Sequence, residues 1–324
     1  MAAVRKATGG STASEHVLAF EVGMNFTRYA LFTNGRIGIP GTIATPTDSV
    51  DSFYDALVDV AKKQAATLAR TGGKIDGITF SMPGFIDTKK QEAVTAGALA
   101  MLYRHRIGEE LAERLEAIGV TGGPDDEQIP SWIENDANCA AMAEKMSGNA
   151  QKLDDFVLLT VDTGLGGALF LDGKIRRGKD WRAGEFGMMV TNYGVAGMLP
   201  LHDFVSTLRL SEDYAEAFDE PSGNVLPSTL FKHLDDPVVK GIVERWVDYI
   251  AVGIFNVVVT VDPEVVLIGG SIAREPALIP MIETALAKNK DWKDFRTSVK
   301  RCRHSGNAGL IGAYYAFATE VLGK

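Results

Sequence analysis

FEVGMNFTRYALFTNGRI, residues 20–37, and LTVDTGLGGALFLDGKI, residues 159–175, are two copies of one pattern. Each copy runs from an apolar strand through a small loop into a second strand, and then reaches an Asn-Gly or Asp-Gly turn. These dipeptides favour the tight turns of β-hairpins. Aligning the glycines of the two loops pairs Glu21 with Asp162, so each copy opens with a carboxylate, and the first loop is three residues longer. The pattern indicates an internal duplication that divides the chain near residue 135.

Helix and strand signals alternate after each copy. Residues 51–70 carry apolar side chains at helical spacing and end at two glycines, and residues 235–259 predict a longer helix. Residues 75–80 and 265–268 predict buried strands. The other predicted elements are helices at 111–118, 138–146 and 276–288 and a strand at 130–133. Because strands that alternate with helices are typical of α/β proteins, the predicted fold class is α/β.

The composition excludes several classes of function. The 324 residues include 42 Asp and Glu against 33 Lys and Arg, and the net charge of −9 opposes binding to nucleic acid or to an anionic membrane surface. The longest mostly apolar stretch, residues 251–261, is shorter than the ~20 residues that a membrane helix needs. Cys139 and Cys302 lie far apart and cannot build a zinc cluster or a disulfide framework. The first sixteen residues lack an apolar segment and predict a disordered tail ahead of a cytoplasmic protein.

Five segments of the chain occur in the order of one known family. They resemble the first phosphate loop, the Pro-Gly turn, the catalytic END-A-N motif, the second phosphate loop and the adenosine motif of the ROK family (repressor, open reading frame, kinase) of sugar kinases. In that order the segments are Glu21–Asn25, Ser81–Asp87, Glu134–Asn138, Asp162–Gly167 and Asp262–Gly270, and Ala308–Ala313 also fits. The resemblance covers residues 17 to about 320.

The resemblance implies a two-domain actin-like ATPase fold, which is duplicated and ribonuclease H-like, with an interdomain cleft. It places residues 1–134 and 306–324 in an N-terminal α/β domain with the first phosphate loop. Residues 135–305 would form a C-terminal α/β domain with the catalytic Asp, the second phosphate loop and the adenosine motif. The activity implied is the phosphorylation of a hexose or aminosugar hydroxyl, with ATP and Mg²⁺. We expect a homodimer that binds a small sugar and neither nucleic acid nor membrane.

Asp136 is the candidate general base. Phosphoryl transfer needs a group that accepts the proton of the attacking hydroxyl, and Asp136 lies where a predicted strand ends and a helix begins. The alternative is that Asp136 only caps the helix, which is a common position for Asp. Asn135 can hydrogen-bond a neighbouring sugar hydroxyl, and the resemblance implies that Gly84 of the Pro-Gly turn also contacts the sugar.

Loop glycines are the candidate phosphate ligands, because backbone N–H groups can point at a phosphate where no Cβ intervenes. Gly164 and Gly166 supply such groups in the second copy, and the Thr163 hydroxyl is a further donor. The resemblance adds Glu21, Gly23 and Asn25 of the first loop and Gly269 and Gly270 of the adenosine motif.

The sequence departs from the family in both phosphate loops. In the first, Glu21, Met24 and Asn25 replace the Asp, the second Gly and the Thr of the pattern Asp-x-Gly-Gly-Thr. In the second, Asp162 stands where the family usually has Gly, and its carboxylate either repels ATP or holds Mg²⁺ through water. The altered first loop leaves a second function open, a degenerate protein that binds a sugar or nucleotide without transferring phosphate.

The zinc-site pattern of the family is mostly absent. Glu185 is retained, but Met188 replaces a His, no cysteine follows, and His202 lies about where the last Glu belongs. We therefore expect no zinc, and Glu185 and His202 become candidates for sugar contacts. A repressor is disfavoured because the sixteen residues ahead of the first loop cannot hold a helix-turn-helix.

Overall fold

The computed structural model describes residues 14–97, 99–123, 128–192 and 197–324. The predicted disordered tail therefore falls largely on residues 1–13, outside the described residues.

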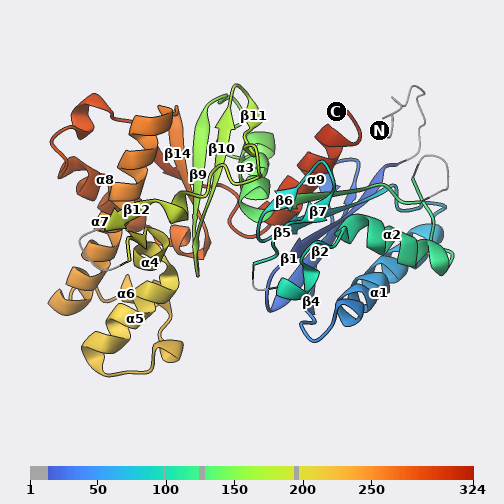
Figure 1. Cartoon of the computed structure of the whole chain (residues 1–324), viewed down its shortest axis with the longest axis horizontal. Coiled ribbons are helices and arrows are strands. Elements are labelled where there is room, and N and C mark those ends of the chain that lie inside the picture. The colour runs from blue at the N-terminus through green and yellow to red at the C-terminus, as the bar shows by residue number, and fades with distance from the viewer. Residues whose placement is uncertain (1–13, 98, 124–127, 193–196) are drawn as a thin grey trace. The chain divides into compact units, whose positions relative to one another are not determined.

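Contacts divide the chain into two units, one of Met1–Ala143 and Asn307–Lys324 and the other of Glu144–Gly306 (Figure 1). The division predicted near residue 135 lies inside the first unit. The reason is that the C-terminal helix packs against the segment that follows residue 135, so closely that a Cβ at Gly312 would lie 1.7 Å from the carbonyl oxygen of Cys139.

The first unit is built on a sheet in which a hairpin precedes parallel strands. β1 (His16–Val22) pairs antiparallel with β2 (Phe26–Thr33) and parallel with β5 (Gly77–Met82), and β5 pairs parallel with β8 (Ser131–Asn135). The strand order is β3-β2-β1-β5-β8, with β4 on β2. The short strands of this unit are β3 (Arg36–Ile37), β4 (Gly41–Ala44), β6 (Ile86–Asp87) and β7 (Glu92–Ala93).

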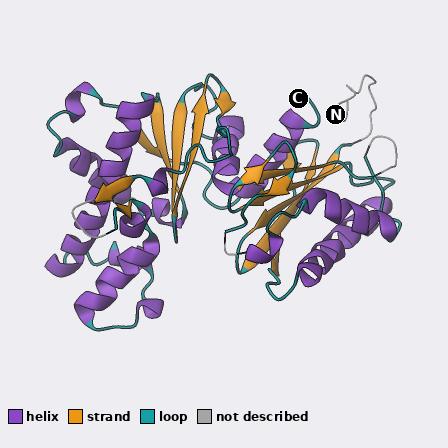
Figure 2. Ribbon diagram, in the orientation of Figure 1, coloured by secondary structure: helices purple, strands orange, loops and turns teal. Residues whose placement is uncertain are grey.

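Two helices cover one face of this sheet (Figure 2). α1 (Val50–Ala69) matches the helix predicted at 51–70. It begins with a cap in which Ser49 Oγ accepts the N–H of Ser52 at 3.1 Å, which satisfies one of the free donors of the first turn. α1 and α2 (Ile107–Ala117) pack together and share one apolar core with the sheet.

The helix α9 (Ala308–Glu320) covers the opposite face. The Thr79 hydroxyl of β5 donates to the carbonyl oxygen of Ala313 at 2.9 Å. The ring of Phe317 lies against Gly77, where a Cβ would come within 2.0 Å of it. This close packing of helix on strand therefore needs a glycine at residue 77.

The second unit repeats the strand order of the first. β9 (Phe156–Val161) pairs antiparallel with β10 (Leu165–Leu171) and parallel with β14 (Val265–Gly269). β11 (Lys174–Ile175) and β15 (Ser298–Arg301) complete the order β11-β10-β9-β14-β15. Because this order corresponds to β3-β2-β1-β5-β8, the duplication predicted from the sequence is present in the fold.

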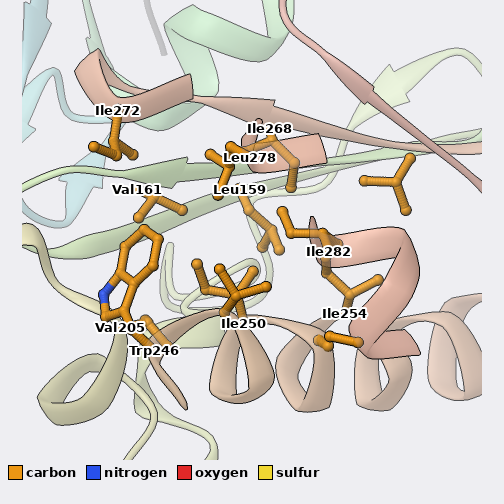
Figure 3. Close-up of a cluster of buried hydrophobic side chains, with 14 of the residues drawn as sticks. Leu159, Val161, Val205, Trp246, Ile250, Ile254, Ile268, Ile272, Leu278 and Ile282 are labelled. Atoms are coloured by element: carbon orange, nitrogen blue, oxygen red, sulfur yellow. The ribbon is translucent and has the colours of Figure 1, made fainter. Parts of the chain in front are cut away.

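The helix α7 (Pro237–Val261) covers one face of the second sheet. Figure 3 shows Leu159 and Ile268 of the sheet pointing toward Trp246 and Ile250 of this helix, and all four side chains are buried. The apolar side chains whose spacing predicted a helix over residues 235–259 are thus the ones that α7 buries.

The remaining elements are short or peripheral. The helices are α3 (Asp136–Ser147), α4 (His202–Val205), α5 (Thr207–Phe218), α6 (Pro227–Leu230) and α8 (Leu278–Ala287), and β12 (Val190–Asn192) pairs with β13 (Leu199–Pro200). Single 3₁₀ turns are η1 (Ala100–Leu102), η2 (Phe186–Met188), η3 (Ser222–Asn224), η4 (Ser271–Arg274) and η5 (Trp292–Asp294). Over the described ranges, no helix is both long and apolar enough to cross a membrane.

The register of the two hairpins corrects the alignment of the two sequence copies. Four residues, 23–26, lie between the paired residues that close the first hairpin, and three, 162–164, lie between those that close the second. The first connection is therefore longer by one residue, and the predicted difference of three was wrong. Glu21 lies inside β1 opposite Arg28, whereas Asp162 lies in the loop after β9, so the two carboxylates are not equivalent.

Candidate active site

The candidate base lies at the carboxyl end of β8. Asp136 is the first residue of α3 and is solvent-exposed. Its Oδ1 accepts the N–H of Ala137 at 2.8 Å and an Nδ2 proton of Asn135 at 3.0 Å. The pKa of Asp136 is raised, because desolvation by the surrounding protein outweighs these hydrogen bonds, which lower it. A carboxylate with a raised pKa and access to water is suited to accept a proton.

Asn135 makes the cap hydrogen bond of α3, while Asp136 accepts the N–H of the next residue, Ala137. Asn135 Oδ1 accepts the N–H of Asn138, three residues later, at 3.0 Å, which is the hydrogen bond of a helix cap. Asn135 Nδ2 donates to Asp136 Oδ1 and to the carbonyl oxygen of Gly84, each at 3.0 Å. The cap hydrogen bond to the third residue along is therefore made by Asn135, and the Asn135 amide joins the Asp136 carboxylate to the Pro-Gly turn.

The junction between β8 and α3 is held by the side chain of Glu134 and by the turn at Gly84. The buried Glu134 accepts the N–H of Asn135 at 3.1 Å and an Nδ2 proton of Asn138 at 2.9 Å, both at Oε1. Gly84 has a φ of +94°, and a Cβ there would lie 2.4 Å from the carbonyl oxygen of Thr95. The turn that receives the Asn135 amide therefore requires glycine.

Glu21 belongs to the same unit and forms an ion pair. Arg28 donates from Nη1 to Glu21 Oε2 at 3.0 Å and from Nη2 to Asn307 Oδ1 at 2.5 Å. Burial raises the pKa of Glu21, the Arg28 charge lowers it and the Asp136 carboxylate raises it, so the two acids interact electrostatically. Gly309 of α9 leaves room for the longer acid, since a Cβ there would lie 2.6 Å from Glu21 Cδ.

The first phosphate loop is held by one threonine. The Gly23 N–H donates to the carbonyl oxygen of Phe26 at 3.1 Å, and a Cβ at Gly23 would lie 2.9 Å from that oxygen. Thr45 donates from Oγ1 to the Gly23 carbonyl at 2.8 Å and from its N–H to the Asn25 carbonyl at 3.0 Å. Met24, which stands where the family has glycine, is 54% exposed.

The second phosphate loop lies in the second unit, between β9 and β10. The Asp162 carboxylate accepts the N–H of Ser271 at 3.1 Å through Oδ2 and the Ser271 hydroxyl at 2.8 Å through Oδ1. Its backbone carbonyl accepts the N–H of Thr207 at 2.7 Å, and its own N–H donates to the Gly164 carbonyl at 2.8 Å. Thr163 is exposed at the tip of the loop.

His202 lies beside the second loop. As the first residue of α4 it accepts the N–H of Leu165 at Nδ1, at 3.3 Å. Its ring packs against Gly164, where a Cβ would lie 2.8 Å from the ring. The close contact of ring and backbone therefore requires glycine at residue 164.

The Glu185 segment and the adenosine motif both belong to the second unit and contact different strands of its hairpin, β10 and β9. Glu185 directly follows Gly184, whose carbonyl oxygen would lie 2.5 Å from a Cβ at Gly167. Gly270, with a φ of +92°, follows β14, and a Cβ there would lie 2.1 Å from the Val161 carbonyl. The structure thus gathers Asp162, Thr163, Gly164, Gly166, Glu185, His202, Gly269 and Gly270 in the second unit, and Glu21, Gly23, Asn25, Gly84, Asn135 and Asp136 in the first.

Sequence reasoning missed three residues of these networks. Arg28 could have been found, because it lies opposite Glu21 once the hairpin register is known. Thr45 and Ser271 have weaker signals, although Ser271 directly follows the Gly-Gly pair of the adenosine motif. Their partners become clear only when loops from different strands are brought together.

Two other features of the described residues lie apart from these networks. No group of three or more His, Cys, Asp or Glu side chains within the described ranges is arranged to hold a metal ion. A groove of about 440 Å³ between α7 and α8, lined by Lys240 and Met281 among others, contains no candidate site residue.

Comparison with known proteins identifies the family. Residues 17–320 match the model of the ROK family. The chain belongs to the ROK family. Beta-glucoside kinase of Listeria innocua serovar 6a is 34% identical over 251 residues, which cover 76% of this chain and 80% of that protein. N-acetyl-D-glucosamine kinase of Escherichia coli O127:H6 is 25% identical over 316 residues, which cover 93% and 99%.

A solved structure shows the same fold. The ROK hexokinase from Thermus thermophilus superposes with a TM-score of 0.76 at 25% identity, covering 95% of this chain and 100% of that one. The predicted actin-like α/β fold and the prediction of a ROK sugar kinase are confirmed by these similarities.

Proposed function

We propose that the protein transfers the γ-phosphoryl group of ATP to a hydroxyl of a hexose-class sugar, with Asp136 as the general base. The observation that carries this proposal is that two different residues, Asn135 and Asp136, cap the helix and present a carboxylate to solvent at the start of α3. Asn135 makes the capping hydrogen bond, while Asp136 keeps solvent access and a raised pKa.

The proposed reaction moves one proton and one phosphoryl group. Asp136 accepts the proton of the sugar hydroxyl as its oxygen attacks the γ-phosphorus, and ADP leaves with the bridging oxygen. The hydrogen bond from Asn135 Nδ2 orients the carboxylate, so we assign Asn135 a positioning role.

The nucleotide would bind through the second unit. The Gly164 N–H and the exposed Thr163 hydroxyl would donate to phosphate, and the Gly269–Gly270 turn would contact the adenosine. Gly166, also predicted as a phosphate ligand, lies within β10 and pairs with Thr160 of β9. Mg²⁺ bound with ATP would neutralise phosphate charge. The Asp162 oxygens already accept hydrogen bonds from Ser271, so no step is assigned to a metal held by Asp162.

A β-glucoside is the proposed substrate class. The beta-glucoside kinase of Listeria innocua is 34% identical to this chain, against 25% for the N-acetyl-D-glucosamine kinase of Escherichia coli. Glu185 and His202, beside the second loop, remain candidates for substrate contact.

The direct test is ADP release by the purified protein with ATP, Mg²⁺ and a panel of sugars. The panel contains methyl β-glucoside, cellobiose, glucose, N-acetylglucosamine and N-acetylmannosamine, with a no-sugar control for ATPase activity. The proposal expects sugar-dependent ADP release that is fastest with a β-glucoside. Sugar binding measured by calorimetry without ADP release on any sugar would instead select a binding protein that does not transfer phosphate.

A further inference from the structure

The second phosphate loop is joined to the adenosine turn, which we define as Gly269–Ser271, by the Asp162 side chain. We propose that Asp162 is a positioning residue that fixes the second phosphate loop and thereby sets the affinity for the nucleotide. This inference rests on the proposed use of ATP, and it assigns a role to the residue that departs from the family pattern.

Both oxygens of the Asp162 carboxylate take part in the junction. Oδ1 accepts the Ser271 hydroxyl at 2.8 Å and Oδ2 accepts the Ser271 N–H at 3.1 Å. Hydrogen bonds to an ionised carboxylate are stronger than those between neutral groups, and two of them fix orientation as well as distance. The partners belong to loops that follow β9 and β14, two neighbouring strands of the sheet.

The backbone of the same loop is held from the other side. The Asp162 carbonyl accepts the N–H of Thr207, the first residue of α5, at 2.7 Å. The Leu165 N–H donates to His202 Nδ1 in α4 at 3.3 Å. The loop is therefore attached on one side to the adenosine turn and on the other to the α4–α5 segment.

A loop held in this way binds phosphate at a lower entropic cost. Backbone N–H groups bind an anion well when they already point in the required directions, because ordering a mobile loop on binding weakens affinity. The Ser271 N–H and hydroxyl donate to the Asp162 carboxylate and so stabilise its negative charge. These hydrogen bonds explain why an acid is present in a loop that is expected to lie near phosphate. Fixing the loop is thus an alternative to the two roles that the sequence left open, repulsion of ATP and binding of Mg²⁺.

The test measures nucleotide binding without turnover. Wild type, Asp162→Ala, Ser271→Ala and the double variant are titrated by calorimetry with the non-hydrolysable analogue AMPPNP, once with Mg²⁺ and once with EDTA. We expect the Kd to rise about ten- to a hundredfold in Asp162→Ala in both buffers, because a bidentate hydrogen bond to a charged group is lost. Ser271→Ala should weaken binding less, since its N–H remains, and the double variant should match Asp162→Ala because the two residues act through each other.

Steady-state kinetics and a control variant distinguish a specific effect on nucleotide binding from a general loss of structure. The KM for ATP should rise with the Kd while the KM for the sugar stays unchanged, and Asp162→Asn, which keeps one acceptor, should restore part of the affinity. The exposed neighbour of His202 supplies the control, because Asp203→Ala should bind AMPPNP as wild type does.

Several outcomes would overturn the inference. One is a wild-type Kd in Asp162→Ala, another is additive effects in the double variant, and a third is weakening that occurs only with Mg²⁺, which would make Asp162 a metal ligand. If Asp162→Ala does not fold, the Ser271→Ala variant alone tests the proposal. A wild-type Kd of Ser271→Ala for AMPPNP would then reject it. A wild-type protein that binds no nucleotide would overturn the proposed function itself, which is a distinguishable result.

Discussion

The two phosphate loops occupy the same position in two sheets of the same strand order, yet their acidic residues make different contacts. In the first unit Glu21 lies within β1 and pairs with Arg28, and the loop itself is held by Thr45. In the second unit Asp162 is part of the loop and holds it to Ser271. Duplication therefore preserved the strand order and not the roles of individual side chains.

This difference suggests that each unit contributes a separate property. The first unit carries the acids that interact electrostatically, Glu21 and Asp136, and so should govern the chemical step. The second unit carries a phosphate loop whose carboxylate is hydrogen-bonded to the adenosine turn, and so should govern nucleotide affinity. Variants in one unit should change one property and leave the other intact.

The largest expected effect is that of Asp136→Asn. The substitution keeps the shape and the Oδ1 acceptor but removes the basicity, so turnover should fall by about 10²–10⁴-fold. Nucleotide affinity and the melting temperature should stay near wild type, because the cap belongs to Asn135. Steady-state kinetics, calorimetry and thermal melting measure the three quantities. A variant with more than about a tenth of wild-type turnover would contradict the assignment of the base.

The next effect concerns the space that α9 leaves for Glu21. Gly309→Ala should lower the free energy of unfolding by about 1–3 kcal/mol, because its Cβ would overlap Glu21 Cδ. Gly241→Ala in α7 is the matched control, since nothing lies within 4 Å of a Cβ there, and it should stabilise by about 0.5–1 kcal/mol. Chemical denaturation measures both.

A second substitution tests the cause of that effect. Glu21→Asp shortens the side chain by one methylene, so Gly309→Ala should cost less stability in the Glu21→Asp background than in wild type. Equal costs in the two backgrounds would mean that Gly309 does not make room for Glu21.

A smaller effect is expected for Thr45→Val, which breaks the contact that holds the first loop. Loss of the hydrogen bonds to the Gly23 carbonyl and to Thr27 should cost about 0.5–1.5 kcal/mol. Hydrogen exchange should become faster at Gly23 and Asn25 and stay unchanged at Asp162 and in the rest of the second loop. Faster exchange in both loops would show that the two are not independent.

The smallest effect is a pH dependence that arises from Glu21. Burial raises the pKa of Glu21 in the folded protein, so the folded state favours the protonated acid, and stability is lost as the pH rises through that pKa. Glu21→Gln lacks this loss. Its stability relative to wild type should therefore improve as the pH rises above 4.5, the ordinary pKa of a Glu carboxyl, as denaturation at several pH values would measure. Parallel stability curves for the two proteins would show that burial of Glu21 is not the origin of the pH dependence.

The regular elements were predictable because they rest on local patterns. Helices α1 and α7 were found from apolar spacing and agree with the predicted ranges within about two residues. Asp136 was placed correctly at a strand-to-helix junction, since a strand pattern ends and a helix pattern begins there. The contacts of Asp162 were not predictable, because its partner Ser271 follows a different strand and is 109 residues away.

The sequence by itself determined the duplication, the alternation of strands and helices, and the residue types available for phosphoryl transfer, because periodicity and motifs are properties of neighbouring residues. Only the tertiary structure decided that Asn135 caps α3 and leaves Asp136 accessible, that Glu21 pairs with Arg28, and that Asp162 holds the second loop to Ser271. Hydrogen bonds between side chains depend on strand register and on the approach of distant loops to within about 3 Å, and neither is written in any local stretch of the chain.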